Sequence, residues 1–144
     1  MILLIFVPLI LGFLVGMSSK PDEWYFKLNK PRFNPPSYAF SIAWSILYFL
    51  IGISYYLALK DKPFVYWIIP ILHLLLNYLY TPTIFIYRKL LESAFIVSLT
   101  LITAIIVAIL FYSYGNYLSA YLLIPYILWL MFANYLAWSV YYLN

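Results

Sequence analysis

Residues 24–56 read WYFKLNKPRFNPPSYAFSIAWSILYFLIGISYY, and this stretch joins a basic, proline-rich segment to a long apolar run. Three prolines, Pro31, Pro35 and Pro36, fall in its first part among cations and aromatic rings. Proline fixes φ and biases the residue before it away from helix, so this part predicts an extended loop. The apolar run that follows is typical of a helix that crosses a membrane.

The composition of the whole chain agrees with a membrane protein. Hydrophobic residues make up 67% of the 144 residues and charged residues 8%, against roughly 25% charged in a soluble domain. A chain of this length cannot bury so much apolar surface in its own interior, so the excess must face lipid. Its length predicts one domain, residues 1–144.

Charge and cysteine content exclude several function classes. The net charge is +4, but the cations flank apolar runs instead of forming one face, which indicates anionic lipid headgroups and not nucleic acid as neighbours. The chain has no cysteine, one histidine and four carboxylates. These numbers leave little material for a disulfide framework, a metal site or a hydrolytic triad. We therefore expect no cofactor.

Five apolar runs are long enough to approach or exceed the roughly 17 residues that a membrane span requires. They cover residues 2–19, 37–60, 64–87, 90–113 and 120–143. We predict an all-α membrane protein with five transmembrane helices in one bundle and an ordered loop, residues 20–36, between helices 1 and 2. Two interpretations of this loop stay open: a lid over the bundle, or an ordinary linker at the membrane surface.

The distribution of cations predicts the orientation. Six of them fall in the first and third loops, namely Lys20, Lys27, Lys30, Arg32, Arg88 and Lys89. The opposite side has only Lys60 and Lys62. Because cytoplasmic loops carry the excess of Lys and Arg, we expect the first loop and the C-terminus in the cytoplasm and the N-terminus outside.

Polar and aromatic side chains share faces of the predicted helices. At about 100° per residue, Trp44 and Tyr48 lie on one arc of the second helix, and Trp129 and Ala133 on one face of the fifth. Tyr and Trp carry polar tips that require partners, which favours faces directed into the bundle. Trp138 falls on the opposite face, toward lipid.

The third predicted helix has a polar face of its own. His73, Asn77 and Tyr80 recur at i, i+4 and i+7, and polar groups at membrane depth normally point inward. His73 fits a hydrogen-bonded core residue better than a ligand or proton relay. Pro70 and Pro82 are expected to kink this helix.

Gly12 and Gly16 form a GxxxG pair in the first span. Small residues at this spacing let another helix approach closely. Packing inside the bundle is the first interpretation, and a homodimer seam is the alternative.

Three segments carry a resemblance to a known family. WYFKLNKPRFNPPSYAFSIAWSILYFLIGISYYL (24–57) is similar to WYxxLxKPxWxPPxxxFxxxWxxLYxxMGxAxYL, and LLIPYILWLMFANYLAWSVYYLN (122–144) to LLxPYxxWxxFAxxLNxxxWxxN. HLLLNYLY (73–80) more weakly resembles QLxLNxxW. These motifs, in this order, resemble the translocator protein family, also called the tryptophan-rich sensory protein or peripheral-type benzodiazepine receptor family (TspO/MBR).

The resemblance implies a five-helix bundle with a ligand pocket beneath the first loop. Family members bind porphyrins, benzodiazepine-type and isoquinoline ligands and, in animals, cholesterol. We also expect an integral, multi-pass protein of a prokaryotic cell membrane. Carried over by position, the ligand-binding residues are Tyr25, Pro36, Phe40, Trp44, Tyr48, Asn77, Trp129, Phe132 and Ala133.

The chain departs from the family pattern at several polar and aromatic positions. The differing residues are Phe33, His73, Tyr80, Ala137 and Tyr141, where the family has Trp, Gln, Trp, Asn and Trp. The core aromatics are retained and the polar contacts are not, so a flat aromatic ligand is a firmer expectation than any named ligand.

Three functions follow from the resemblance. The first is a receptor or sensor for porphyrins, with Lys27, Lys30 and Arg32 either pairing with propionates or anchoring headgroups. The second is a transporter, which the absence of an acidic residue inside a span disfavours. The third is light-dependent porphyrin breakdown, in which Trp44 and Trp129 would be the photo-oxidation partners and no acid–base catalytic residue is implied.

Overall fold

The computed structural model describes residues 2–144, and this part of the chain folds into helices and connecting loops without a strand. The elements in order are a 3₁₀ helix (Ile2–Phe6), α1 (Val7–Ser18), α2 (Glu23–Phe26), α3 (Ser37–Leu59), a 3₁₀ helix (Phe64–Trp67), α4 (Ile68–Phe85), α5 (Leu90–Ser113), α6 (Tyr117–Leu122) and α7 (Ile124–Leu143). The all-α prediction is confirmed.

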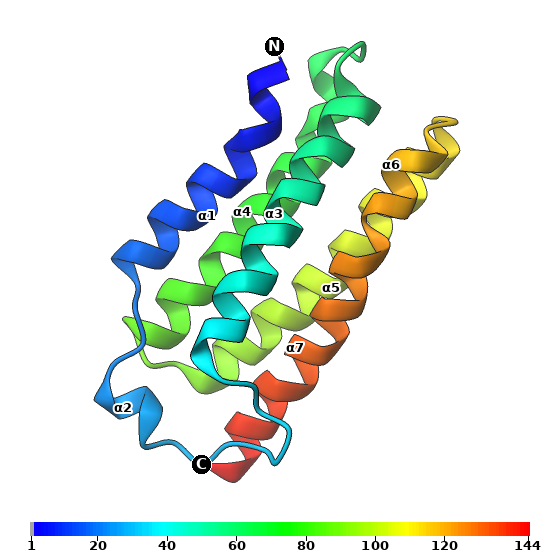
Figure 1. The fold of residues 1–144 in the computed structure, drawn as a ribbon. Helices are drawn as coiled ribbons and strands as arrows, with labels where there is room; N and C mark the ends of the chain where they lie inside the picture. The colour runs from blue at the N-terminus through cyan, green and yellow to red at the C-terminus, as the bar shows by residue number, and fades with distance from the viewer. Residues whose placement is uncertain (1) are drawn as a thin grey trace.

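The longer helices run alongside one another, with the N-terminus at one end of the bundle and the C-terminus at the other (Figure 1). Four helical segments are long and apolar enough to cross a membrane: Ser37–Leu59, Phe64–Phe85, Leu90–Ser113 and Tyr117–Leu143. The N-terminal apolar segment, Ile2–Ser18, is shorter. The structure therefore has four long apolar helices and one short one.

Prolines mark where helices begin, and one of them corrects a prediction. Pro70 lies in the first turn of α4, directly after a 3₁₀ turn, where its missing N–H costs no hydrogen bond. The expectation that Pro70 kinks this helix from within is therefore wrong. Pro82 does lie inside α4, which ends three residues later at Phe85. Pro125 occupies the first turn of α7, where the last apolar run is divided into α6 and α7.

The end of the bundle near the N-terminus is densely packed. Ile51, Leu59, Val107 and Phe111 there are fully buried. Polar contacts join the same region, since Ser54 donates to the carbonyl of Ser119 at 2.7 Å. This core holds α3, α5 and α6 together.

Glycines let α1 approach α3 in the same half. A Cβ added to Gly52 would overlap the backbone carbonyl of Ile5, and one added to Gly12 would overlap the ring of Tyr48. Gly16 has no atom within 4 Å of its Cβ position. Gly12 therefore serves packing inside the bundle, as the first interpretation of the glycine pair predicts, and a homodimer stays a prediction.

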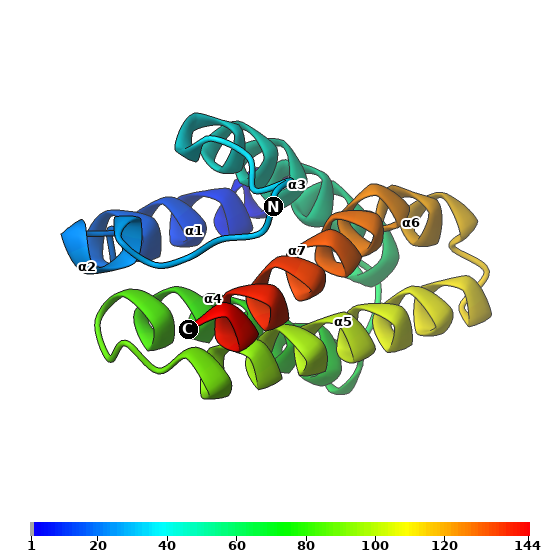
Figure 2. The ribbon, with the colours of Figure 1, turned by 90° about the horizontal axis from the view of Figure 1, so that it is seen from below.

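The loop between α1 and α3, which includes α2, crosses the other end of the bundle (Figures 1 and 2). Asp22 caps α2 by accepting from the N–H of Tyr25 at 3.3 Å. Asn29 donates its N–H to Oδ1 of Asn144 at 3.0 Å, and Nδ2 of Asn144 donates back to the carbonyl of Asn29 at 2.9 Å. The loop is thus fastened to the C-terminus, and we call residues 20–36 the lid.

Candidate functional site

A cavity of about 930 Å³ lies between the lid and the adjoining halves of α1, α3, α4, α5 and α7. Tyr25 and Pro36 of the lid line it at one end, and Asn77 lines it from α4. Its volume is within the range of about 300–1,000 Å³ that is usual for small-molecule sites. The same helices that pack solidly at the far end therefore enclose a hollow here.

Aromatic rings form much of the cavity wall. Trp44 and Tyr48 are stacked with ring centroids 5.3 Å apart, and both line the cavity. Tyr25 meets the ring of Phe85 edge-on at 4.9 Å. Such a wall offers flat faces for stacking and edge contacts with a flat aromatic molecule.

Seven of the nine predicted ligand-binding residues line the cavity: Tyr25, Pro36, Phe40, Trp44, Tyr48, Asn77 and Ala133. The other two, Trp129 and Phe132, do not. The Trp129 ring lies 5.9 Å from that of Phe40 and 6.4 Å from that of Trp44, and Phe132 lies 5.7 Å from Trp129. Trp129 therefore supports the rings that face the cavity, and its buried Nε1 has no hydrogen-bond partner.

A hydrogen-bond network connects the cavity to the bundle core. Tyr48 donates its hydroxyl to Oδ1 of Asn77 at 2.7 Å, and Nδ2 of Asn77 donates to the hydroxyl oxygen of Tyr126 at 2.5 Å. The Tyr126 hydroxyl lies 2.8 Å from Nε2 of His73. The second N–H of the Asn77 amide has no partner in this network, and Asn77 lines the cavity.

The network ends on α5. Nδ1 of His73 lies 2.6 Å from Oγ1 of Thr103, which is 3.0 Å from the carbonyl of Leu99. One assignment of protons satisfies every group: Tyr126 donates to Nε2, Nδ1–H donates to Thr103, and Thr103 donates to its own helix. His73 is neutral in this arrangement. The prediction of a hydrogen-bonded core histidine is confirmed.

The sequence alone did not predict the cavity residues of α1 and α5, nor some of those of α7. The cavity residues it left out of the site include Leu9, Gly12, Gly16, Tyr80, Val97, Thr100, Leu136 and Val140. Most of these are small or aliphatic and give no chemical signal. The available signal was Thr100, a small polar residue inside the fourth apolar run (residues 90–113), which the structure buries.

The charged side chains that line the cavity are two lysines at its lid end, Lys20 and Lys30. No carboxylate of the described residues lines it. The Nζ of Lys30 donates to the carbonyl of Tyr25 at 2.8 Å and lies 4.6 Å from the centroid of its ring. Burial lowers the pKa of Lys30 and raises the pKa of the Tyr25 hydroxyl. Of the three cations predicted to meet propionates, only Lys30 lines the cavity.

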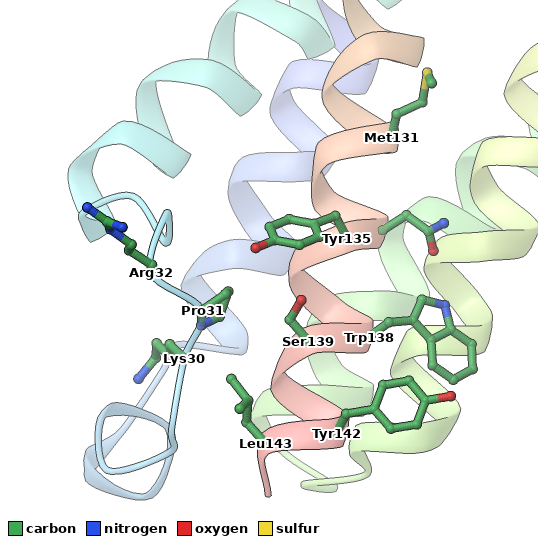
Figure 3. Close-up of a pocket in the computed structure, with 10 residues that line it drawn as sticks. Lys30, Pro31, Arg32, Met131, Tyr135, Trp138, Ser139, Tyr142 and Leu143 are labelled. Carbon is green, nitrogen blue, oxygen red and sulfur yellow. The ribbon is translucent and has the colours of Figure 1, made fainter.

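A second, shallower groove of about 720 Å³ lies outside the bundle, between the lid and the C-terminal half of α7 (Figure 3). Tyr135 and Ser139 point toward the lid there, whereas Arg32 points away from α7. Trp138 lies on the other flank of α7. The groove therefore does not gather the cations that border it.

Trp138 corrects a further prediction. Its Nε1 donates to Oγ of Ser98 on α5 at 2.9 Å, and its ring meets that of Phe95 edge-on at 5.1 Å. The expectation that Trp138 faces lipid is wrong, because the ring is half-buried against α5. Its hydrogen bond joins α7 to α5 near the lid end.

Comparisons with known proteins agree with the resemblance. The sequence model of the TspO/MBR family matches residues 4–143. The chain is 33% identical over 124 residues, 84% of its length and 80% of the relative's, to the tryptophan-rich protein TspO of Bacillus cereus. It is 32% identical over 137 residues, 90% and 83% of the two chains, to protein CrtK of Rhodobacter capsulatus.

A third relative matches a shorter segment more closely. The tryptophan-rich sensory protein of Cereibacter sphaeroides is 54% identical over 39 residues, which is 27% of this chain and 25% of the relative. The family match together with the long apolar helices identifies an integral, multi-pass membrane protein.

Proposed function

The chain belongs to the TspO/MBR family, and we propose that it is a membrane receptor or sensor that binds a flat, hydrophobic aromatic ligand such as a porphyrin in the cavity under the lid. The cavity itself carries this proposal, because it combines aromatic faces with few polar groups. Trp44 and Tyr48 supply the faces. Asn77, whose amide has one N–H outside the network, supplies a polar group, and Lys30 supplies a cation at the lid.

A porphyrin matches this arrangement chemically. Its ring would lie against Trp44 and Phe40, and its propionates would point toward the lid, where Lys20 and Lys30 line the cavity. A carboxylate in this position would form charge-assisted hydrogen bonds, which are about twice as strong as neutral ones. Among the residues that the structure describes, no Asp or Glu lines the cavity to oppose it.

The proposal includes a fifth transmembrane segment, Ile2–Ser18. Five residues of 3₁₀ helix and twelve of α-helix rise about 28 Å, at roughly 2.0 and 1.5 Å per residue, which approaches the roughly 30 Å hydrocarbon core. With five spans, the lid and C-terminus share one side. The excess of cations there favours the cytoplasm for that side.

The test is a titration of the purified protein with protoporphyrin IX in detergent, followed by Trp fluorescence and porphyrin absorbance. We expect saturable binding that Trp44→Phe and Asn77→Ala each weaken by about tenfold. Trp129→Phe is the matched control, because Trp129 lies behind the wall, and its effect should stay within about threefold. Quenching that does not saturate and ignores all three substitutions would indicate partition into micelles and contradict the proposal.

A second candidate is light-dependent oxidation of the bound porphyrin by dissolved dioxygen, favoured by the position of Trp44 at the cavity surface, in edge-on contact with Trp129. If it occurs, illuminated Trp44→Phe protein should degrade bound porphyrin more slowly than Trp129→Phe protein at equal occupancy. Ion-coupled transport is less favoured, because Asp22, Glu23, Asp61 and Glu92 all lie in loops or first helical turns.

A further inference from the structure

The two helices that flank the cavity on one side, α1 and α3, are in contact at one end and apart at the other. Far from the lid, Gly52 of α3 packs on the backbone of Ile5, in the 3₁₀ helix that leads into α1. One helical turn closer to the lid, Gly12 of α1 packs on the ring of Tyr48. The next small residue of α1 toward the lid is Gly16, whose Cβ position has no atom within 4 Å. The helices therefore diverge between Gly12 and the lid.

The facing side of α3 shows the same divergence. At about 100° per residue, Gly52, Tyr48, Ser45 and Ser41 follow one side of the helix. Gly52 is buried and Tyr48 half-buried, but Ser45 and Ser41 are exposed. Farther from the lid, α1 covers this side of α3. The exposure of Ser41 and Ser45 therefore means that no helix covers the same side near the lid.

The cavity reaches the surface through this gap. Gly16, Ser41 and Ser45 all line the cavity, and all three are exposed. Because α1 no longer covers this side of α3 at the level of Ser41 and Ser45, exposed residues that line the cavity here lie at its mouth. The cavity thus has an opening between α1 and α3, bordered by small side chains.

The opening lies in the span and not in the lid. Ser41 and Ser45 are four and eight residues from the start of α3, or about 6 and 12 Å along its axis. The Ser45 hydroxyl donates to the carbonyl of Ser41 at 2.8 Å, so this side chain can face acyl chains without a lost hydrogen bond. On the aqueous side, the bonds between Asn29 and Asn144 hold the lid against the C-terminus.

We propose that the gap between Gly16 and Ser41–Ser45 is a lateral portal through which a ligand dissolved in the bilayer enters the cavity. This inference rests on the proposed function. It specifies the ligand further, as a molecule that partitions into the membrane before it binds. The lid then acts as a fixed cover and not as the entrance.

The absence of cysteine from the chain makes a site-specific test direct. Ser41→Cys places one thiol at the portal, and Ile42→Cys places one on the neighbouring residue, which is 57% exposed and does not line the cavity. Each variant, in lipid nanodiscs, is labelled with a bulky maleimide. The association and dissociation rates of protoporphyrin are then measured by stopped-flow quenching, before and after labelling.

Labelling Ser41→Cys should slow association and dissociation together by at least about tenfold and leave the Kd nearly unchanged, because a blocked passage affects both directions equally. Labelling Ile42→Cys should change neither rate by more than about twofold. Faster dissociation after labelling of Ser41→Cys would mean that the label fills the cavity, and equal rates for both variants would mean another route. Either result overturns the portal.

A second pair of thiols tests the alternative entrance. Asn29→Cys with Asn144→Cys, joined by a disulfide or a short cross-linker, fixes the lid to the C-terminus. Association should be unchanged if the ligand enters from the side, and slowing by this cross-link alone would overturn the portal in favour of the lid. A wild-type protein without saturable binding would overturn the proposed function itself, which is a different result from a normal Kd with the wrong rates.

Discussion

The half of the bundle far from the lid is solid, and the half beneath the lid is hollow, although the same helices build both. Every buried residue of α3 lies between Leu47 and Leu59. The first ten residues of α3, from Ser37, instead border the cavity with Phe40, Trp44 and exposed serines. One helix therefore stabilises the fold with one part of its length and lines the cavity with the other.

Glycines have opposite effects on helix packing in the two halves. Gly52 allows two backbones to touch, whereas Gly16 leaves a space open. Voids forfeit dispersion contacts that a packed interior would have. The solid half must supply the stability that the hollow half lacks, so equivalent substitutions should have very different consequences in the two.

The largest effect is expected at Gly52. A Cβ in Gly52→Ala would overlap the backbone of Ile5, which cannot rotate away, so α1 must shift. Overpacking of this kind costs roughly 1–3 kcal/mol, and the thermal midpoint in detergent should fall. Gly16→Ala is the matched control: it meets open space and should gain up to about 1 kcal/mol from helix propensity. Equal midpoints for both variants would contradict the contrast between the two halves.

An intermediate effect is expected at Tyr126, where the two halves meet. Tyr126→Phe removes one hydroxyl that bonds both Asn77 and His73 and leaves two buried groups without partners. We expect a loss of about 1–2 kcal/mol in unfolding free energy. Tyr55→Phe in the solid half removes a single bond, to the carbonyl of Pro70, and should cost about 0.6 kcal/mol. Denaturant titration in mixed micelles compares the two, and a larger loss for Tyr55→Phe would refute the network.

The sequence predicted those features that depend on local rules. Apolar runs predicted the helices, and the spacing of His73 and Asn77 predicted an inward polar face. The family resemblance supplied seven of the residues that line the cavity, because its motif positions carry over one by one to this chain. These features need no knowledge of how the helices are placed relative to one another.

The features it missed depend on where helices meet. Trp129 shares a helical face with Ala133, yet only Ala133 reaches the cavity, because Phe40 and Trp44 stand between Trp129 and the void. Trp138 was assigned to lipid because its face is opposite, but α5 covers that face. The different environments of Gly12 and Gly16 arise from the divergence of two helices, which no single-helix pattern contains.

The smallest effect concerns the exposed ion pair between Asp22 and Arg88, which adds to the neutral hydrogen bonds that fasten the lid. Desolvation acts to raise the pKa of Asp22, but the N–H of Tyr25 and the guanidinium of Arg88, 2.8 Å away, outweigh it and hold the pKa below its ordinary value of 3.8. A lowered carboxyl pKa means that this attachment is complete above that value and is lost as the pH falls through the lowered one. The lid should therefore loosen only below about pH 4.

Hydrogen exchange of residues 20–36, corrected for intrinsic rates, measures this loosening between pH 3 and 7. Exposed ion pairs contribute little, so the change in protection should be about twofold. Asp22→Asn is the informative variant, because asparagine still caps α2 while the charge is gone. Its lid should exchange slightly faster at pH 7 and show no step near pH 4. If the variant kept the wild-type step in exchange rate, a titrating group other than Asp22 would hold the lid. The bonds between Asn29 and Asn144 could not cause that step, because neither side chain titrates.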